Sequence, residues 1–158
     1  RGRWFWFLHA DCVPELETIR SLPGYLHTVD LRWGFFKQRI SDPSPWFRLI
    51  EMGNNLRGRI FNLPYGDQGI MVRRDLYFRC GGYAQVPFLE DVILSRCLSR
   101  ICRPTVINKT IRITSRHWRS LGPFFTTIRN ISIAFRFLAL RQSPADLLGY
   151  YLKWEKPH

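Results

Sequence analysis

The chain has 158 residues, of which 24 are Lys or Arg and 12 are Asp or Glu, so its formal net charge is +12. This length fits one domain with a sizeable core. With 46% hydrophobic and 15% aromatic residues, the sequence excludes a disordered or low-complexity protein. The positive charge favours acidic partners: nucleotide phosphates, nucleic acid or an anionic membrane surface.

The cysteines indicate a reducing compartment, because the four of them form no CxxC pair and no His-rich segment accompanies them. The longest apolar stretch, residues 124–140, contains Arg129 and Arg136 and is not a membrane span. We therefore expect a cytoplasmic protein. Because Arg1 leads almost directly into a strand-like segment, we also expect the chain to be a fragment of a longer protein.

The first elements alternate between strand and helix. Trp4–Leu8 is a short continuous apolar run, typical of a strand buried on both faces in a parallel sheet. A helix is expected from Pro14 to about Leu22, ended by Pro23-Gly24, and an extended segment over residues 27–40.

Residues 46–61 predict an amphipathic helix. Its expected buried residues are Phe47, Ile50, Leu56 and Ile60, and its expected exposed residues are Arg48, Arg57 and Arg59. The remaining predicted elements are a loop over 63–68, a strand over 69–72, helices over 74–80 and 90–101, a β-rich segment over 105–118, and a helical tail over 124–156 interrupted at Ser143-Pro144.

Strands alternating with helices predict an α/β fold. In such sheets, ligands bind beyond the carboxyl ends of the strands, and His9-Ala10-Asp11 follows the most apolar strand at such a place. No flexible linker divides the chain. We expect one α/β domain over residues 1–122 and a basic amphipathic helical tail over 123–158.

Acidic residues stand at the junctions between predicted elements. Asp11 follows the first strand, where a carboxylate is costly unless it binds a metal or a hydrogen-bond donor. Each acid also has a structural explanation: Asp11 as a helix cap, Asp67 in an Asx-turn, and Glu90-Asp91 at a helix N-terminus. The residues alone leave both interpretations open.

Four motifs together resemble glycosyltransferase family 2, and within it the bacterial subgroup known as radical-SAM/selenodomain-associated transferases. They are His9-Ala10-Asp11, Leu63-Pro64-Tyr65-Gly66-Asp67-Gln68, Leu89-Glu90-Asp91-Val92 and Thr114-Ser115-Arg116-His117-Trp118. The resemblance covers nearly the whole chain. It implies a GT-A fold, a Rossmann-like nucleotide-diphospho-sugar transferase sheet, and transfer of a sugar with inversion from a nucleotide-sugar donor to an acceptor hydroxyl, in some cases lipid-linked.

The resemblance also implies residue roles. Asp11 matches the acid that holds Mg2+ or Mn2+ on the donor diphosphate, and Asp91 matches the general base. The implied substrate-binding residues are His9, Asp67, Gln68, Glu90, Arg116 and Trp118. In this picture Arg116 meets the diphosphate charge, and Trp118 stacks on a sugar or base.

The chain departs from the family pattern at several positions. His9 replaces the first acid of the metal motif, His117 stands where the subgroup usually has a second Arg, and Cys12 stands where it has a hydroxyl residue. The family's nucleoside-binding portion is expected to precede Arg1, so a truncated or degenerate transferase without activity is an alternative.

The tail is the most basic part of the chain, with eight of the twelve net positive charges in residues 103–158. Phe124, Ile128, Ile131 and Phe135 follow helical spacing, whereas Arg129 and Arg136 share another face. This pattern favours either a helix in an anionic membrane interface, with the arginines toward lipid phosphates, or a helix packed on the sheet or at a homodimer contact. The first alternative implies a peripheral position at the inner face of the membrane.

Binding of nucleic acid is the alternative from a different functional class. Twenty arginines interleaved with aromatic residues are able to contact phosphates and stack on bases. The sequence carries no recognised nucleic-acid-binding motif, and its basic residues are dispersed instead of forming one run. We therefore expect no specific nucleic-acid partner.

Overall fold

A computed structural model describes residues 2–28 and 30–155, which form two compact units. The first unit contains the residues up to Ala84 and Asp91–Thr114, and the second contains Gln85–Glu90 and the residues from Ser115 onward. The expected domain boundary at residue 122 stays a prediction.

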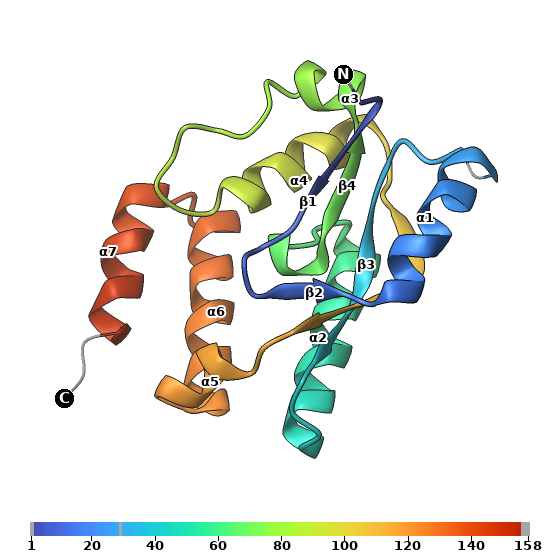
Figure 1. The fold of residues 1–158 in the computed structure, drawn as a ribbon. Coiled ribbons are helices and arrows are strands. Elements are labelled where there is room, and N and C mark those ends of the chain that lie inside the picture. Colours follow the sequence, from blue (N-terminus) through green and yellow to red (C-terminus); the bar gives the residue numbers. More distant parts are fainter. Residues whose placement is uncertain (1, 29, 156–158) are drawn as a thin grey trace. The chain divides into compact units, whose positions relative to one another are not determined.

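The helices and strands are shown in Figure 1. They are β1 (Trp4–Phe7), β2 (Cys12–Pro14), α1 (Leu16–Thr28), β3 (Trp33–Ile40), α2 (Pro45–Phe61), the 3-10 helix η1 (Gly66–Gln68), β4 (Ile70–Arg73), α3 (Arg74–Arg79), α4 (Glu90–Ile101), β5 (Thr105–Ile113), α5 (Arg116–Leu121), α6 (Pro123–Leu138) and α7 (Pro144–Glu155).

The first unit is built on a five-stranded mixed sheet with the order β1-β4-β3-β5-β2. Strands β3 and β5 run parallel, and the other neighbouring pairs run antiparallel. The α/β fold class is therefore confirmed. The parallel setting expected for Trp4–Leu8 is wrong, because β1 pairs antiparallel with β4 at an edge of the sheet.

Strand β1 is half-buried, although its residues are all aromatic. Its side chains alternate between the two faces of the sheet. Trp6 packs on Phe36 with ring centroids 5.1 Å apart, and Phe5 and Phe7 lie 5.1 and 5.3 Å from the ring of Tyr77. The apolar run therefore correctly indicates that both faces of the strand make contacts, but it does not indicate whether the strand pairs parallel or antiparallel.

Strands β1 and β2 lie at opposite edges of the sheet, although only residues 8–11 separate them in the sequence. This short connection therefore crosses the end of the sheet. A hydrogen bond of 3.0 Å from Cys12 N to His9 O closes its turn. His9 and Asp11 are both exposed there, so the crossing presents their side chains to solvent.

Helix α1 continues beyond the predicted stop and includes Pro23. A proline inside a helix removes one backbone donor and clashes with the preceding turn. Packing offsets this cost, because Thr18 Oγ1 donates to Thr110 O on β5 and Leu22 is buried. The extended segment consequently begins only at Trp33.

The core of the first unit lies between β3, β4, α3 and α4. One cluster of buried residues in this core consists of Trp33, Ile70, Val72, Leu76, Leu94 and Leu98, and strand β5 adds further buried residues such as Ile107 and Ile111. Trp33 Nε1 donates a 2.8 Å hydrogen bond to Cys102 O, so the one polar atom of this side chain is satisfied. The periodic apolar side predicted for residues 90–101 is confirmed by Val92, Leu94 and Leu98.

Helix α2 has the expected bounds, and Phe47 is buried and Arg59 exposed as expected, but the expectation is wrong for four other residues. Leu56 and Ile60 are exposed, whereas Arg48 and Arg57 face the protein. Glu51 is buried, accepts a hydrogen bond from Ile40 N and pairs with Arg48 at 2.9 Å. Hydrogen bonding to β3 therefore determines which side of this helix faces inward.

Replacement of two glycines of the first unit by alanine should change the free energy of unfolding in opposite directions. A Cβ at Gly34 would collide with Thr105 O in the neighbouring strand, whereas a Cβ at Gly53 of α2 would meet nothing within 4 Å. We expect Gly34→Ala to lower the free energy of unfolding by about 1–3 kcal/mol. Gly53→Ala should raise it by up to about 1 kcal/mol through helix propensity. Urea unfolding of both variants tests the register of β3 on β5, and a neutral Gly34→Ala would contradict it.

Candidate functional site

Three segments that are far apart in the sequence meet at Gly66 in η1. Gly66 N donates a 2.6 Å hydrogen bond to Asp91 Oδ2 at the start of α4. A Cβ on Gly66 would collide with His9 Nε2 and would lie 3.2 Å from Asp91 Oδ2. The connection after β1, the 3-10 helix and the N-terminus of α4 therefore come together at a point where only glycine fits.

Asp67 lies next to this point. One of its carboxylate oxygens accepts a hydrogen bond and the other does not. Its Oδ2 accepts a 2.6 Å hydrogen bond from Gln38 Nε2 on β3. Its Oδ1 is buried and has no hydrogen-bond partner within residues 2–28 and 30–155. A buried carboxylate oxygen without a donor is costly, so a substrate hydroxyl or a cation at this position would be stabilised.

The environment of Asp67 raises the pKa of its carboxyl group above the ordinary value of 3.8. Burial is the largest cause, and the negative charge of Asp91 adds to it. The positive charge of Arg57, the proximity of His9 and the hydrogen bond from Gln38 oppose the increase. The site thus holds two interacting carboxylates whose mutual repulsion is only partly balanced.

Asp11 is connected to the same place through Cys12. The Sγ atom of Cys12 lies 3.5 Å from Asp67 O and 3.9 Å from Asp11 Oδ1. The pKa of the Cys12 thiol is raised to about 12, first by burial and then by the negative charges of Asp11 and Asp67. The structure therefore brings Asp11, Asp67 and Asp91 into one region of the first unit.

A polar network from α2 supports η1 from the other side. The Arg57 guanidinium stacks over the Tyr65 ring at 3.5 Å and donates to Gln68 Oε1 at 3.3 Å. Gln68 is fully buried. Asn54 Nδ2 donates to Gln38 Oε1 at 2.8 Å, which orients the Gln38 amide toward Asp67. Each of these residues positions another group of the site.

Most of this network was not expected from the sequence. Gln38, Asn54, Asn55 and Tyr65 received no role, and Arg57 was expected to be exposed. A signal was present: Asn54-Asn55 occupies the middle of a helix, where asparagine is a poor helix former. A pair of amides at such a position indicates hydrogen bonding to another element, here from Asn55 to both backbone groups of Gln38.

The second unit contains Glu90, Arg116 and Trp118. Trp118 is buried and Arg116 is exposed at the start of α5; the side chain of His117 lies outside the described residues. Leu89, directly before Glu90, has a φ of 63°. Such a left-handed conformation is strained for a bulky residue, and strain of this kind is enriched at functional sites. Membership of these three residues in the site stays a prediction.

The tail helices correct one expectation. Phe124, Ile128, Ile131 and Phe135 form an exposed stripe on α6, as expected for an interfacial face. Arg129, however, is fully buried and stacks over Tyr151 at 4.1 Å, so it is not directed toward lipid phosphates. Across the described ranges, no helix is long and apolar enough to cross a bilayer.

The expected divalent metal at Asp11 stays a prediction. No set of three His, Cys, Asp or Glu side chains is arranged as a metal site within the described part of the chain. Mg2+ on a diphosphate needs no such set, because one or two protein carboxylates together with phosphate oxygens and waters usually hold it. The exposed carboxylate of Asp11 is a hard oxygen donor of this kind.

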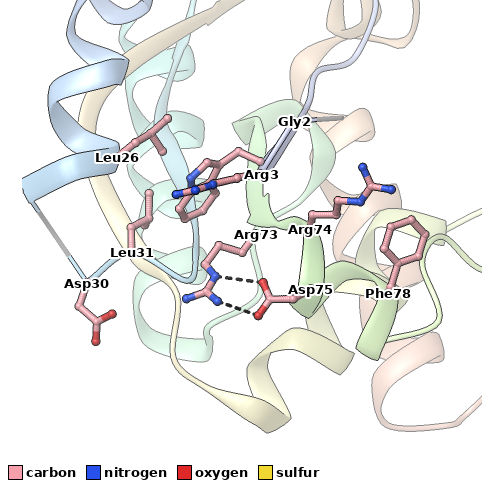
Figure 2. Close-up of a pocket in the computed structure, with 10 residues that line it drawn as sticks. Gly2, Arg3, Leu26, Asp30, Leu31, Arg73, Arg74, Asp75 and Phe78 are labelled. Carbon is pink, nitrogen blue, oxygen red and sulfur yellow. Dashed lines mark hydrogen bonds and ion pairs between the residues drawn. The ribbon is translucent and has the colours of Figure 1, made fainter.

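A cavity of about 820 Å³ lies at the other end of β1 and β4 (Figure 2). Arg3, Arg73 and Arg74 line it together with Asp75, and two hydrogen bonds of 3.0 and 2.8 Å join Arg73 to Asp75. Trp4 pairs with Arg73 at this end, whereas Phe7 pairs with Ile70 at the end nearer Gly66. The cavity is therefore separate from the carboxylates, and we assign it no part in their chemistry.

Comparison with known proteins gives no match to a protein-family model, to a curated protein or to a solved structure. The functional argument accordingly depends on the residues and on their geometry.

The raised pKa of Asp67 predicts a pH-dependent effect of Asp67→Asn on stability. Because the folded-state pKa lies above the unfolded value, ionisation favours the unfolded chain, and the native protein loses stability as pH rises from about 3.8 through the raised pKa. We expect Asp67→Asn to be more stable than the native protein at pH 7, and this gain should shrink toward zero as the pH falls below 4.

Urea unfolding of both proteins across this pH range measures the effect. Asp75→Asn is the matched control, since Arg73 lowers the pKa of Asp75 and its replacement should bring no gain at pH 7. A gain for Asp67→Asn that does not change with pH would contradict the assignment.

Proposed function

We propose that the protein is a metal-dependent inverting glycosyltransferase with a GT-A fold, related to family 2, that uses a nucleotide-sugar donor. The observation that carries this proposal is the meeting of Asp11, Asp67 and Asp91 from three separate segments in one region of the first unit. Acids that served only as local caps or turns would have no reason to converge. The resemblance of the four motifs supports the same activity.

Asp91 is the proposed general base. The hydrogen bonds from Gly66 N to Oδ2 and from Val92 N to Oδ1 fix the plane of its carboxylate, and each oxygen keeps a lone pair that is able to accept a proton. In an inverting transfer, this carboxylate takes the proton of the acceptor hydroxyl as its oxygen attacks the anomeric carbon. General-base catalysis of this kind typically contributes about 10²–10⁴ in rate.

Asp67 is the proposed ligand of a donor-sugar hydroxyl. Gln38 holds Oδ2, so Oδ1 stays available in a buried position. A hydroxyl that donates to this oxygen would satisfy it, and the low polarity of the surroundings would strengthen that hydrogen bond. Gln68 and Glu90 are proposed to bind substrate, as the resemblance implies, and His9 is proposed to contact the donor beside Gly66.

Asp11 is the proposed residue that holds Mg2+ or Mn2+. When bound, the ion offsets the charge that grows on the departing nucleoside diphosphate. Arg116 and Trp118 are proposed to contact the diphosphate and the sugar or base. Their roles rest on the resemblance alone.

Two substitutions separate the proposed roles. We expect Asp91→Asn to lower sugar transfer by about 10²–10⁴, because the amide cannot accept the proton, and to leave donor affinity within about twofold of the native value. Asp11→Ala should weaken Mg2+-dependent donor binding by about tenfold or more, since a metal ligand is lost.

Donor affinity is measured by titration calorimetry with UDP- and GDP-sugars, with and without Mg2+. Sugar transfer is measured as product formation by the full protein that is encoded by the reading frame containing this chain. Asp75→Asn, at an exposed acid away from the site, is the control and should retain both properties. Full turnover by Asp91→Asn would refute the base assignment. Donor binding without turnover in the native protein would indicate the degenerate transferase instead.

A further inference from the structure

Helix α2 buries Phe47, but otherwise it directs mainly polar side chains toward the protein and large apolar side chains outward. Glu51, Asn54, Asn55 and Arg57 hydrogen-bond to β3, to η1 or to each other. The outward residues are Trp46, Leu49, Met52, Leu56, Ile60 and Phe61, with exposed fractions from 37% to 71%. This is the reverse of an ordinary surface helix, whose apolar stripe faces the core.

The outward side is a continuous stripe and not a set of scattered residues. Leu49, Met52, Leu56 and Ile60 follow each other at intervals of three or four residues, which places them on one side of the helix. Large contiguous apolar patches of this kind mark interaction surfaces. We call these residues, with Trp46 and Phe61, the α2 stripe.

The exposed charge of α2 beside the stripe is positive, and the acid nearest to the start of the helix is Asp42, whose carboxylate accepts a hydrogen bond from Ser44 N. The only acid of α2 is Glu51, which is buried and paired with Arg48. Arg59 is exposed beside the stripe. At the N-terminal end of the helix, a cavity of about 250 Å³ is lined by Arg39, Arg48 and Arg112, of which Arg112 also bonds to Glu15.

We propose that the α2 stripe docks on an anionic lipid bilayer, with the helix lying in the plane of the interface. Apolar side chains enter the boundary between headgroups and acyl chains, and nearby arginines meet lipid phosphates. A symmetric contact between two copies of the stripe fits less well, because it would bring Arg59 of each copy to a surface that offers no exposed acid from α2.

This docking does not rest on the proposed glycosyltransferase activity, but it bears on its acceptor. Asn54 and Arg57, which lie on other sides of α2 than the stripe, position Gln38 and η1. A helix is about 10 Å across, and Asp67 lies beyond Gln38, so its carboxylate would stand above the bilayer by more than that distance. An acceptor hydroxyl on a lipid headgroup is the chemical class that this arrangement serves.

The test is co-sedimentation with vesicles of phosphatidylcholine alone and of phosphatidylcholine with 30% phosphatidylglycerol. We expect binding to the anionic vesicles and, for the double variant Leu56→Asp/Ile60→Asp, partitioning weaker by about tenfold or more. Arg59→Glu should weaken it by about tenfold without touching an apolar contact. It also keeps the test valid if the double variant does not fold.

Three matched variants serve as controls: Ile19→Asp on α1, Arg79→Glu on α3 and Ile131→Asp/Phe135→Asp on α6, all at exposed positions. The first two should bind like the native protein. The proposal is overturned if the native protein does not bind, if the α2 variants bind unchanged, or if only the α6 variant loses binding. It is also overturned if sedimentation without lipid shows a dimer that the α2 variants abolish, because the occupant is then a second copy.

Discussion

The hydrogen bond from Gly66 N to Asp91 Oδ2 is the constraint on which the candidate site depends. It joins η1 to the first turn of α4, and the missing side chain of Gly66 leaves room for the His9 imidazole. Any side chain at this position would separate the imidazole from the carboxylate. Because Asp67 follows Gly66 directly, the same bond also determines where the second carboxylate lies.

Keeping Asp67 buried requires donors on its other side, and α2 supplies them indirectly. The amides of Asn54 and Asn55 hold Gln38, and Gln38 holds Asp67. A helix that directs these amides inward directs the opposite side, with Leu49, Met52, Leu56 and Ile60, outward. The exposed apolar side of α2 and the buried polar site are therefore two consequences of one helix orientation.

Most helices and strands could be predicted from the sequence, but which of their side chains are buried and what those side chains contact could not. Residues 45–61 and 90–101 are periodic enough to be identified as helices, and the segment from Leu63 to Gln68 has turn chemistry. Pro23 misled the prediction because tertiary contacts outweighed a local breaker. The face of α2 was assigned from hydropathy alone, which cannot register hydrogen bonds between its amides and a strand that precedes it in the chain.

The positions of the acids at element junctions left their convergence open, the family resemblance implied it, and neither indicated their energetic coupling. Spacing does not reveal that burial and Asp91 raise the pKa of Asp67, or that Arg57 opposes this increase from a stacked position over Tyr65. With one carboxylate oxygen held by Gln38 and the other lacking a partner in the described chain, the site stores unfavourable electrostatic energy. A donor hydroxyl or a divalent cation would lower this energy. Burial destabilises the ionised Asp67 when no ligand is bound, and the same burial would therefore favour binding of such a ligand.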